Sequence, residues 1–329
     1  MYKFDRVFQD KKMNPLVSII IPTHDRPELL LRAVRSAASQ TYKNTEIIVV
    51  DDVGNVSSDE LKIISDKVRY LRIPETYWIS DNRNAGIKIA IGKYIANLDD
   101  DDIWFEDFLE TIIPVMEADN SIGLACTNGY QINNLDENPH RQLFPHYQTG
   151  MQGNLFIRAI WDCFVLPSLM VIRKDVFDDL GGYRNCRGED LDLIMRISAF
   201  TNMYYTPKPC GVWYRRRDTS SASEHAQLTL HGRLDVLIPA LECLYNIQQT
   251  AVLRGRKFSI VERLVLYLQM YFFSCYIAAV YFMFKNPERF TILKQVIMLY
   301  PLLTPFTLLT PLCCSKFVRD VGQNLKRRF

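Results

Sequence analysis

Short apolar runs recur along the first hundred residues, and each of them ends in polar side chains. The runs are Leu16–Ile21, Glu46–Val50, Val68–Ile73 and Tyr94–Leu98. They are rich in β-branched residues and lack strict alternation, which is typical of strands buried on both faces of a sheet. The pattern therefore predicts an α/β fold.

Amphipathic segments lie between these runs. The predicted helices are Pro27–Ser39, Asp59–Asp66 and roughly Asn82–Ile91. In the first of them a proline occupies the tolerated first turn and the apolar residues share one face. Strands that alternate with helices predict a mostly parallel sheet, and such sheets bind ligands outside the carboxyl ends of their strands.

The pattern becomes less regular after residue 104. We expect helices over Phe105–Ala118, Lys174–Leu180 and from Arg187 to about Phe200, with strands over Ile122–Thr127 and Ser168–Ile172. Residues 128–165 mix Asn, Pro, Gly and aromatic side chains. That composition predicts a loop-rich wall beside the sheet.

The overall composition is that of a globular protein, with 48% hydrophobic and 23% charged residues among 329. The net charge of +2 is uneven, because residues 250–329 carry 12 Lys or Arg against 3 Asp or Glu. An acidic body argues against nucleic acid as a partner, whereas a basic tail fits anionic lipid. The eight cysteines form no CxxC pair, so we expect free thiols in a reducing compartment.

Two uncharged runs characterise the tail. Leu264–Phe284 would form a helix of ~31 Å, long enough to span a bilayer. Val296–Cys314 is also uncharged but is interrupted by prolines. The flanks and the connector, Lys285–Gln295, are all basic, which favours a hairpin in the cytoplasmic leaflet over two full spans. The alternative for these two runs is a soluble helical subdomain or a dimer interface.

At the other end of the chain, Met1–Pro15 has no apolar segment resembling a secretory signal.

Four consecutive acids, Asp99–Asp102, follow the fourth predicted strand. Two carboxylates ~5 Å apart repel by roughly 3 kcal/mol at an effective dielectric of ~20, so such a run favours a bound cation. Hard oxygen ligands suit Mg²⁺ or Mn²⁺, which complete their coordination with water and phosphates. His24-Asp25 and Asp51-Asp52 end two other strands, and together the three ends predict a metal–diphosphate site. A solvated acidic turn is the alternative, and neither GxGxxG nor GxxxxGK[ST] occurs.

Seven segments resemble, in order, the motifs of family 2 glycosyltransferases, which have the GT-A fold. They are Val17–Thr23, Ser39–Tyr42, Glu46–Asp52, Asn84–Ile95, Leu98–Trp104, Gly181–Tyr183 and Gly188–Asp190. The resemblance covers roughly residues 15–220 and implies transfer of a sugar from a nucleotide donor, with inversion. The QxxRW motif of processive synthases is absent, which implies one sugar per encounter.

The family pattern also implies roles for donor-side residues. The nucleobase of the donor would be held by Asp52 and by two residues of one turn, Thr23 and Asp25. Asp99 and Asp101 would form the DxD signature, with Asp99 near the ribose or sugar and Asp101 on Mn²⁺ or Mg²⁺. The acid between them stands where Ser is common, which leaves the register of the acids ambiguous.

Two further roles lie later in the chain. Asp190 would be the general base, although acids in a first helical turn are also ordinary dipole partners. The family often has a His after Val212–Arg215, whereas this chain has Arg216–Ser221. Arg217 would neutralise the donor diphosphate there, unless the arginines form a solvated cluster.

These expectations define a GT-A domain over residues 1–225, with a nucleotide-sugar half (15–104) and an acceptor half (105–225), followed by a helical membrane-associated region (226–329). We expect a metal-dependent inverting enzyme with a UDP-linked donor and a lipid-linked glycan acceptor. It would act at the cytoplasmic face of an inner membrane in surface polysaccharide, O-antigen or capsule biosynthesis. A nucleotidyltransferase that makes nucleotide sugars and a catalytically idle sugar-binding or scaffold protein are the alternatives, and the oligomeric state is open.

Overall fold

The computed structural model describes residues 14–54, 56–76, 78–132, 143–144, 147–161, 164–186, 188–214, 243–244, 246–247, 250–251 and 254–268. The chain divides into two compact units. The first consists of Met1–Gln152, Val165–Gly182 and Met203–Tyr214, and the second of Gly153–Phe164, Tyr183–Asn202 and Arg215–Phe329.

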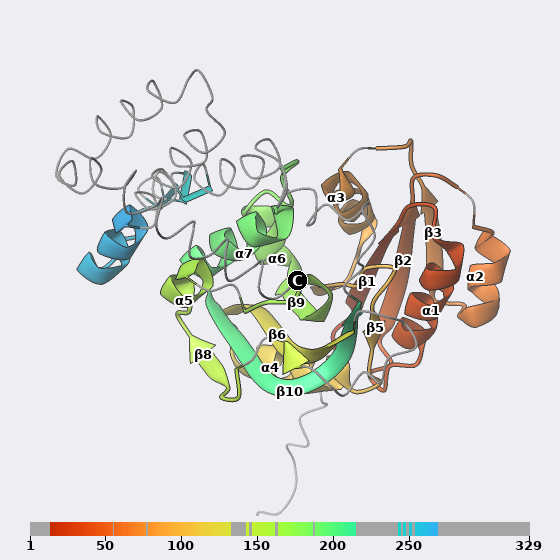
Figure 1. Cartoon of the computed structure of the whole chain (residues 1–329), viewed down its shortest axis with the longest axis horizontal. Coiled ribbons are helices and arrows are strands. Elements are labelled where there is room, and N and C mark those ends of the chain that lie inside the picture. The colour runs from red at the N-terminus through yellow and green to blue at the C-terminus, as the bar shows by residue number, and fades with distance from the viewer. Residues whose placement is uncertain are drawn as a thin grey trace, which may run out of the picture. The chain divides into compact units, whose positions relative to one another are not determined.

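Four parallel strands open the first unit, in the order β3-β2-β1-β4 (Figure 1). They are β1 (Val17–Thr23), β2 (Thr45–Asp51), β3 (Val68–Arg72) and β4 (Tyr94–Asn97). All four coincide with the predicted apolar runs to within one residue at most ends. Their carboxyl ends lie at one edge of the sheet, as parallel pairing requires.

Helices cover both faces of this parallel half. They are α1 (Pro27–Ala38), α2 (Ser58–Ile64) and α3 (Ile79–Ile89). Ile19 and Ile21 of β1 share a core with Leu30 of α1. Ile20 points the other way, because a Cβ added to Gly86 of α3 would lie 2.8 Å from its Cγ2. The continuous apolar runs thus reflect burial on both faces.

Beyond β4 the sheet turns antiparallel, which corrects the expectation of a mostly parallel sheet. The remaining order is β9 (Met170–Arg173), β6 (Ile122–Ile132), β10 (Asn202–Tyr214) and β5 (Ile103–Trp104). β4 pairs with β9, β9 with β6 and β10 with β5, all antiparallel. A buried strand has the same apolar pattern whether it pairs parallel or antiparallel with its neighbour. The sequence pattern therefore could not reveal the antiparallel half of the sheet.

The structure also contains elements in the segment predicted to be irregular. They are the end of β6, β7 (Leu143–Phe144), β8 (Met151–Gly153) and α5 (Phe156–Trp161). The chain then forms the 3₁₀ turn η2 (Pro167–Leu169), α6 (Lys174–Asp179) and α7 (Glu189–Phe200). α4 (Phe108–Ala118) begins three residues later than predicted, since β5 precedes it and the Phe105 amide donates to the Cys210 carbonyl.

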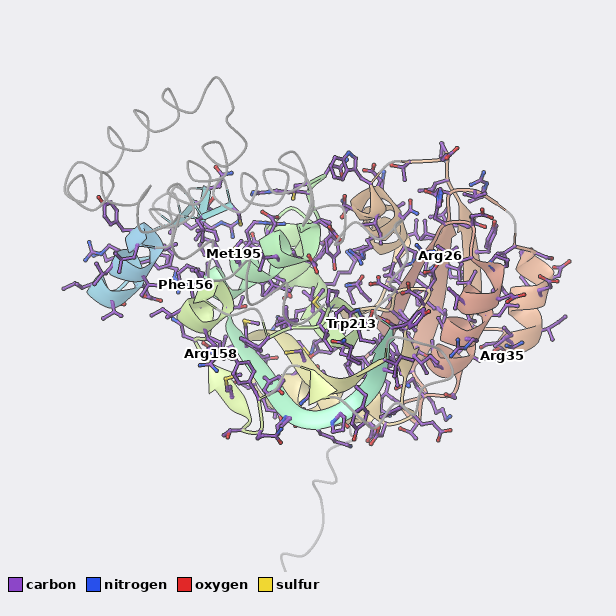
Figure 2. The ribbon with its side chains drawn as sticks, viewed as in Figure 1. Arg26, Arg35, Phe156, Arg158, Met195 and Trp213 are labelled. Carbon is purple, nitrogen blue, oxygen red and sulfur yellow. The ribbon has the colours of Figure 1, made fainter. Side chains whose placement is uncertain are left out.

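The second unit has its own apolar core, built on α5 and α7. Its buried members are Phe156, Ile160, Met195, Ala199, Cys243, Leu244, Ile247, Ala251, Phe258 and Leu266; Figure 2 labels Phe156 and Met195. Phe156 and Phe258 stack with ring centroids 5.3 Å apart. Arg256 lies 4.8 Å from the Phe258 ring centroid and 3.2 Å from a Glu262 carboxylate oxygen. The segment 254–268 is therefore part of a packed unit.

The predicted membrane tail is only marginally represented in this structure. Within the described ranges no helix combines the length and the apolar character needed to cross a membrane. Residues 269–329, which hold most of the first uncharged run and all of the second, lie outside the described residues, as does Arg217. The four described cysteines, Cys126, Cys186, Cys210 and Cys243, are free thiols, as expected.

Candidate active site

The acidic run leaves β4 at the carboxyl edge of the sheet, and two of its four acids are deeply buried. Asp100 accepts a hydrogen bond from Thr23 Oγ1 at 2.8 Å and pairs with Arg26 Nη1 at 3.0 Å. Asp102 accepts from the Tyr214 backbone amide at 2.9 Å. Both residues are at most 4% exposed. These two carboxylates tie the run to neighbouring segments.

The alternate acids keep access to solvent. The Asp99 side chain is 27% exposed and the Asp101 side chain 16%. Asp99 Oδ1 lies 2.7 Å from Nη2 of the buried Arg83, and Asp101 Oδ2 lies 3.3 Å from Arg26 Nη1. Asp99 and Asp101 therefore form the solvent-accessible face of the run.

Negative charge is incompletely balanced in this cluster. Burial, followed by the neighbouring carboxylates of Asp99 and Asp100, raises the pKa of Asp101 to about 7. Burial and the carboxylates of Asp101 and Asp99 raise the pKa of Asp102 well above its ordinary value. Arg26 opposes the rise for Asp101, and Asp100 and Asp101 raise the pKa of Arg26 against the effect of burial. A cation near Asp101 would therefore be favoured electrostatically.

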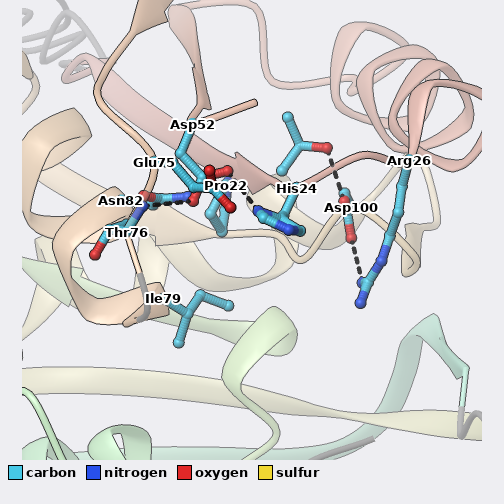
Figure 3. A pocket seen from close by; sticks show the side chains of 10 residues that line it. Pro22, His24, Arg26, Asp52, Glu75, Thr76, Ile79, Asn82 and Asp100 are labelled. Carbon is cyan, nitrogen blue, oxygen red and sulfur yellow. Dashed lines mark hydrogen bonds and ion pairs between the residues drawn. The ribbon is translucent and has the colours of Figure 1, made fainter. Parts of the chain in front are cut away.

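A pocket of about 590 Å³ opens beside the run, a size usual for small-molecule sites. It is lined by Pro22, Thr23, His24, Arg26, Asp52, Glu75, Thr76, Ile79, Asn82 and Asp100. Asp52, Thr76 and Asn82 lie toward one end of it in Figure 3. Arg26 and Asp100 lie toward the other. The pocket thus has one end formed by the Arg26–Asp100 ion pair and another end where Asp52 and Glu75 lie among neutral polar side chains.

The two acids that end β2 have different environments. Asp51 Oδ1 accepts from the backbone amides of Val53 and Gly54, so this side chain shapes the turn after the strand. Asp52 lines the pocket, with Oδ1 2.8 Å from His24 Nδ1. The Thr76 amide donates to Asp52 Oδ2 at 3.4 Å. Asp52 is thus the acid of the pair that a ligand in the pocket could reach.

The residues of the turn after β1 have different environments. Thr23 and His24 line the pocket, whereas Asp25 is exposed and has a φ of 52°. Aspartate tolerates this left-handed conformation better than most residues. Thr23 therefore lines the same pocket as Asp52 and Asp100, whereas Asp25 is not among the residues that line it.

The carboxylate oxygens of Asp99 and Asp101 suit a hard divalent cation that is held by few protein ligands. In the described part of the chain no three His, Cys, Asp or Glu side chains gather as a metal cage. Asp99 and Asp101 offer two carboxylates, and Mg²⁺ or Mn²⁺ commonly binds through one or two carboxylates plus phosphate oxygens and water. Burial and then the carboxylates of Asp99 and Asp100 raise the pKa of Asp101, and such an ion would stabilise its ionised form.

The predicted base lies in the second unit, in the first turn of α7. Asp190 is half-buried, and its Oδ1 accepts from the Leu191 amide at 2.8 Å. Asp192 is buried, with Oδ2 2.8 Å from Arg196 Nε and Oδ1 3.3 Å from Arg184 Nη1. Asp192 is thus committed to ion pairs, which leaves Asp190 and Glu189 as the carboxylates of this turn that could serve a substrate.

The sequence assigns no role to several residues at or near the pocket. Arg26 directly follows the turn that holds Thr23 and Asp25, and Asn82 and Arg83 begin the predicted helix Asn82–Ile91. α3 begins at Ile79, three residues earlier than predicted. Thr76 precedes it and has no distinguishing pattern. The sequence signal that could have pointed to Arg26 is its place after the first predicted strand, because the carboxyl ends of parallel strands lie at one edge of the sheet.

Comparisons with known proteins give a consistent picture. Residues 18–181 match the model of the family described as glycosyl transferase family 2. An uncharacterized glycosyltransferase of Rickettsia conorii is 30% identical over 224 residues, which cover 60% of this chain and 35% of that protein. The Escherichia coli protein WfaP, a UDP-Glc:alpha-D-GlcNAc-diphosphoundecaprenol beta-1,3-glucosyltransferase, is 40% identical over 112 residues. That match covers 32% of this chain and 42% of WfaP. The chain thus spans well under two thirds of either relative.

Solved structures resemble this chain in fold. TarS 1–349 from S. aureus in complex with UDP-GlcNAc has a TM-score of 0.54 at 14% identity, covering 94% of this chain and 91% of that one. The mannosyltransferase PcManGT from Pyrobaculum calidifontis, in complex with GDP-Man and Mn²⁺, has a TM-score of 0.53 at 13% identity. That match covers 94% of this chain and 88% of PcManGT. At these identities the likeness concerns the fold.

Proposed function

Because this chain belongs to glycosyl transferase family 2, and so contains a glycosyltransferase domain, we propose that it transfers one sugar from a nucleotide-diphosphate donor to an acceptor hydroxyl, with inversion at the anomeric carbon. One observation carries the proposal. A pocket of suitable size lies against an acidic run whose accessible carboxylates are Asp99 and Asp101, and burial and the neighbouring carboxylates raise the pKa of Asp101 to about 7. A diphosphate with a divalent cation complements such a site.

The donor would lie along the pocket, with its base toward Asp52 and its diphosphate toward Arg26 and Asp101. Mn²⁺ or Mg²⁺ would be held by Asp101 and Asp99 and, when bound, takes up charge that develops on the leaving diphosphate. Thr23 orients Asp100 through its 2.8 Å hydrogen bond and so shapes the Arg26–Asp100 end of the pocket. We propose a UDP-linked donor, in line with the donor in the printed name of WfaP.

Asp190 is the proposed general base. Its carboxylate would remove the proton of the attacking hydroxyl, which makes that oxygen a better nucleophile. The ion pairs of Asp192 with Arg196 and Arg184 support this choice, because a buried carboxylate whose oxygens are engaged by two guanidinium groups is not available to a substrate hydroxyl. Arg217 remains a proposed partner of the diphosphate.

The acceptor and the location follow from the sequence and one relative. The name of WfaP includes a diphosphoundecaprenol-linked sugar, and we propose a lipid-linked glycan acceptor in surface polysaccharide assembly. The proposed domain limits are residues 1–225 for the GT-A domain (15–104 donor half, 105–225 acceptor half) and 226–329 for the membrane-associated region. Its basic tail would hold the protein on the anionic cytoplasmic leaflet as a peripheral or monotopic protein.

A donor panel tests this function. The unfolding temperature of the full chain is measured with UDP-, GDP- and dTDP-sugars, each with Mn²⁺ and with EDTA. Ligand that binds only the folded state raises the unfolding temperature, so we expect a Mn²⁺-dependent rise with a UDP-sugar. Transfer to a lipid-linked glycan is then followed by release of UDP. No rise with any nucleotide sugar in Mn²⁺ would contradict the proposal.

A further inference from the structure

One polar side chain at the Asp52 end of the pocket has a buried oxygen without a hydrogen-bond partner. Asn82, on the first turn of α3, is 3% exposed, and its Oδ1 has no hydrogen-bond partner among the described residues. Buried amide oxygens are almost always paired, because an unpaired one loses its hydration without compensation. An unpaired group that lines a cavity is therefore a group that a ligand can satisfy.

The surroundings of Asn82 suit a flat heterocycle. Pro22 and Ile79 line the same pocket, and Ile79 is 41% exposed although it is a large apolar residue. These two side chains offer apolar surface to the faces of a ring. Asp52 also lines this end, and its two oxygens already accept one hydrogen bond each, from His24 and the Thr76 amide. Glu75 lines this end too but is exposed, so Asn82 Oδ1 is the buried oxygen here that accepts no hydrogen bond from the described residues.

We infer that Asn82 is a specificity-determining residue that reads the edge of the donor's nucleobase, an assignment that rests on the proposed function. Uracil presents an N3–H donor beside a carbonyl oxygen. The Asn82 amide presents the complementary pair, because Oδ1 accepts from N3–H while Nδ2 donates to the carbonyl oxygen. Binding of uridine diphosphate satisfies the buried Oδ1, and the two contacts add base recognition to the contact predicted for Asp52.

A paired change in protein and ligand tests this contact. UDP and N3-methyl-UDP are titrated in Mn²⁺ against the full chain and against Asn82→Ala. In the parent, the methyl group removes the N3–H donor and collides with the amide, so we expect N3-methyl-UDP to bind roughly 10- to 100-fold more weakly than UDP. In Asn82→Ala the smaller side chain leaves room for the methyl group, and the two ligands should bind within about threefold of each other. Lys88→Ala, on the exposed side of the same helix, should keep the parent ratio.

A second variant separates recognition from folding. Asn82→Leu has nearly the same shape but no polar atoms, so the nucleotide-free protein should unfold at the same temperature as the parent or higher. Its affinity for UDP should still fall about tenfold or more. If the unfolding temperature drops instead and UDP affinity holds, Asn82 is structural and the inference fails. Equal UDP to N3-methyl-UDP ratios in the parent and Asn82→Ala also overturn it while leaving the proposed function intact, whereas a parent that binds no nucleotide overturns both.

Discussion

At the scale of single residues, the four consecutive acids have different structural environments. Asp100 and Asp102 point into the protein, where Thr23 and the Tyr214 amide hold them. Asp99 and Asp101 retain solvent access. The alternation favours the Asp99/Asp101 register for the DxD signature, which the sequence left ambiguous because all four side chains are chemically equal.

The raised pKa of Asp101 predicts a pH-dependent stability. Burial and the carboxylates of Asp99 and Asp100 raise this pKa from 3.8 to about 7 in the folded protein. The folded state therefore binds the proton more tightly, and this group's contribution to stability is full below pH 3.8 and is lost as pH rises through about 7. In EDTA, Asp101→Asn should raise the unfolding temperature at pH 8 by roughly 2–8 °C and have little effect near pH 4. An unchanged unfolding temperature at pH 8 would show that the carboxylate is not destabilised.

The proposed base makes a second prediction at this scale. Asp190→Asn preserves shape but cannot accept a proton, so sugar transfer should fall roughly 10²–10⁴-fold while donor and metal affinity stay near the parent values. Transfer is measured with saturating donor, and affinity by calorimetry. Glu189→Gln is the matched comparison. If Glu189→Gln loses transfer and Asp190→Asn does not, the base is the neighbouring residue.

Asp192 is unsuitable as a control for that experiment. Asp192 lies two positions along the same helix, but its carboxylate is engaged in ion pairs with Arg196 and Arg184. Removing one partner from a buried ion pair is strongly destabilising, so loss of activity in Asp192→Asn would report on folding.

At the scale of elements, continuous apolar runs predicted strands correctly. A long strand with an irregular pattern was not recognised from the sequence. β1 to β4 followed from β-branched runs between turn residues. β10 was missed entirely, since Pro207, Pro209 and Gly211 interrupt it and normally argue against a central strand. Yet Gly211 pairs with Trp104, and an added Cβ there would lie 2.6 Å from the Ile103 carbonyl oxygen. Close approach of another strand, which no single segment encodes, selects the glycine.

The packing of α3 on the sheet predicts the effect of filling a glycine. A Cβ at Gly86 would lie 2.8 Å from Ile20 Cγ2 and 2.9 Å from Val50 Cγ2, both in buried residues. Overpacking costs about 1–3 kcal/mol, while alanine gains about 1 kcal/mol in helix propensity. Gly86→Ala should therefore lower the free energy of unfolding by up to about 2 kcal/mol in denaturant titrations. Lys88→Ala is the exposed control on the same helix, and a Gly86→Ala protein as stable as the parent would show that α3 can shift.

At the scale of the whole molecule, the sequence placed the donor pocket by a topological argument that needs no side-chain detail. Polar residues at the carboxyl ends of neighbouring parallel strands must meet, and Thr23, Asp52 and Asp100 do line one pocket. Base contacts such as Asn82 could not be predicted, because they depend on where a helix begins and on which face it turns inward. The division into two units also could not be predicted from the sequence, because the second unit consists of segments that are distant in sequence.

The second unit refines the experiment that tests membrane attachment. Phe258 and Leu266 belong to its core, and Glu262 pairs with Arg256. A truncation that removes residues 259–329 would therefore damage the packed core of the second unit. Removing residues 269–329 spares every described residue. We expect the intact chain to float with vesicles that contain anionic phosphatidylglycerol, and the shortened chain to remain in the soluble fraction. Floating of the shortened chain would place the attachment elsewhere, and an intact chain that stays soluble with such vesicles would remove the support for a lipid-linked acceptor.

Metal-dependent donor binding at Asp101 is the central claim, and calorimetry tests it most directly. UDP is titrated into the parent, Asp101→Ala and Asp59→Ala, each with Mn²⁺ and with EDTA, after circular dichroism has shown that each variant is folded. Asp59 lies on α2, in the first turn, and is the matched surface control. We expect Mn²⁺-dependent UDP binding in the parent and in Asp59→Ala, and loss of the Mn²⁺ dependence in Asp101→Ala. A folded Asp101→Ala protein that binds UDP with the parent's Mn²⁺ dependence would contradict it.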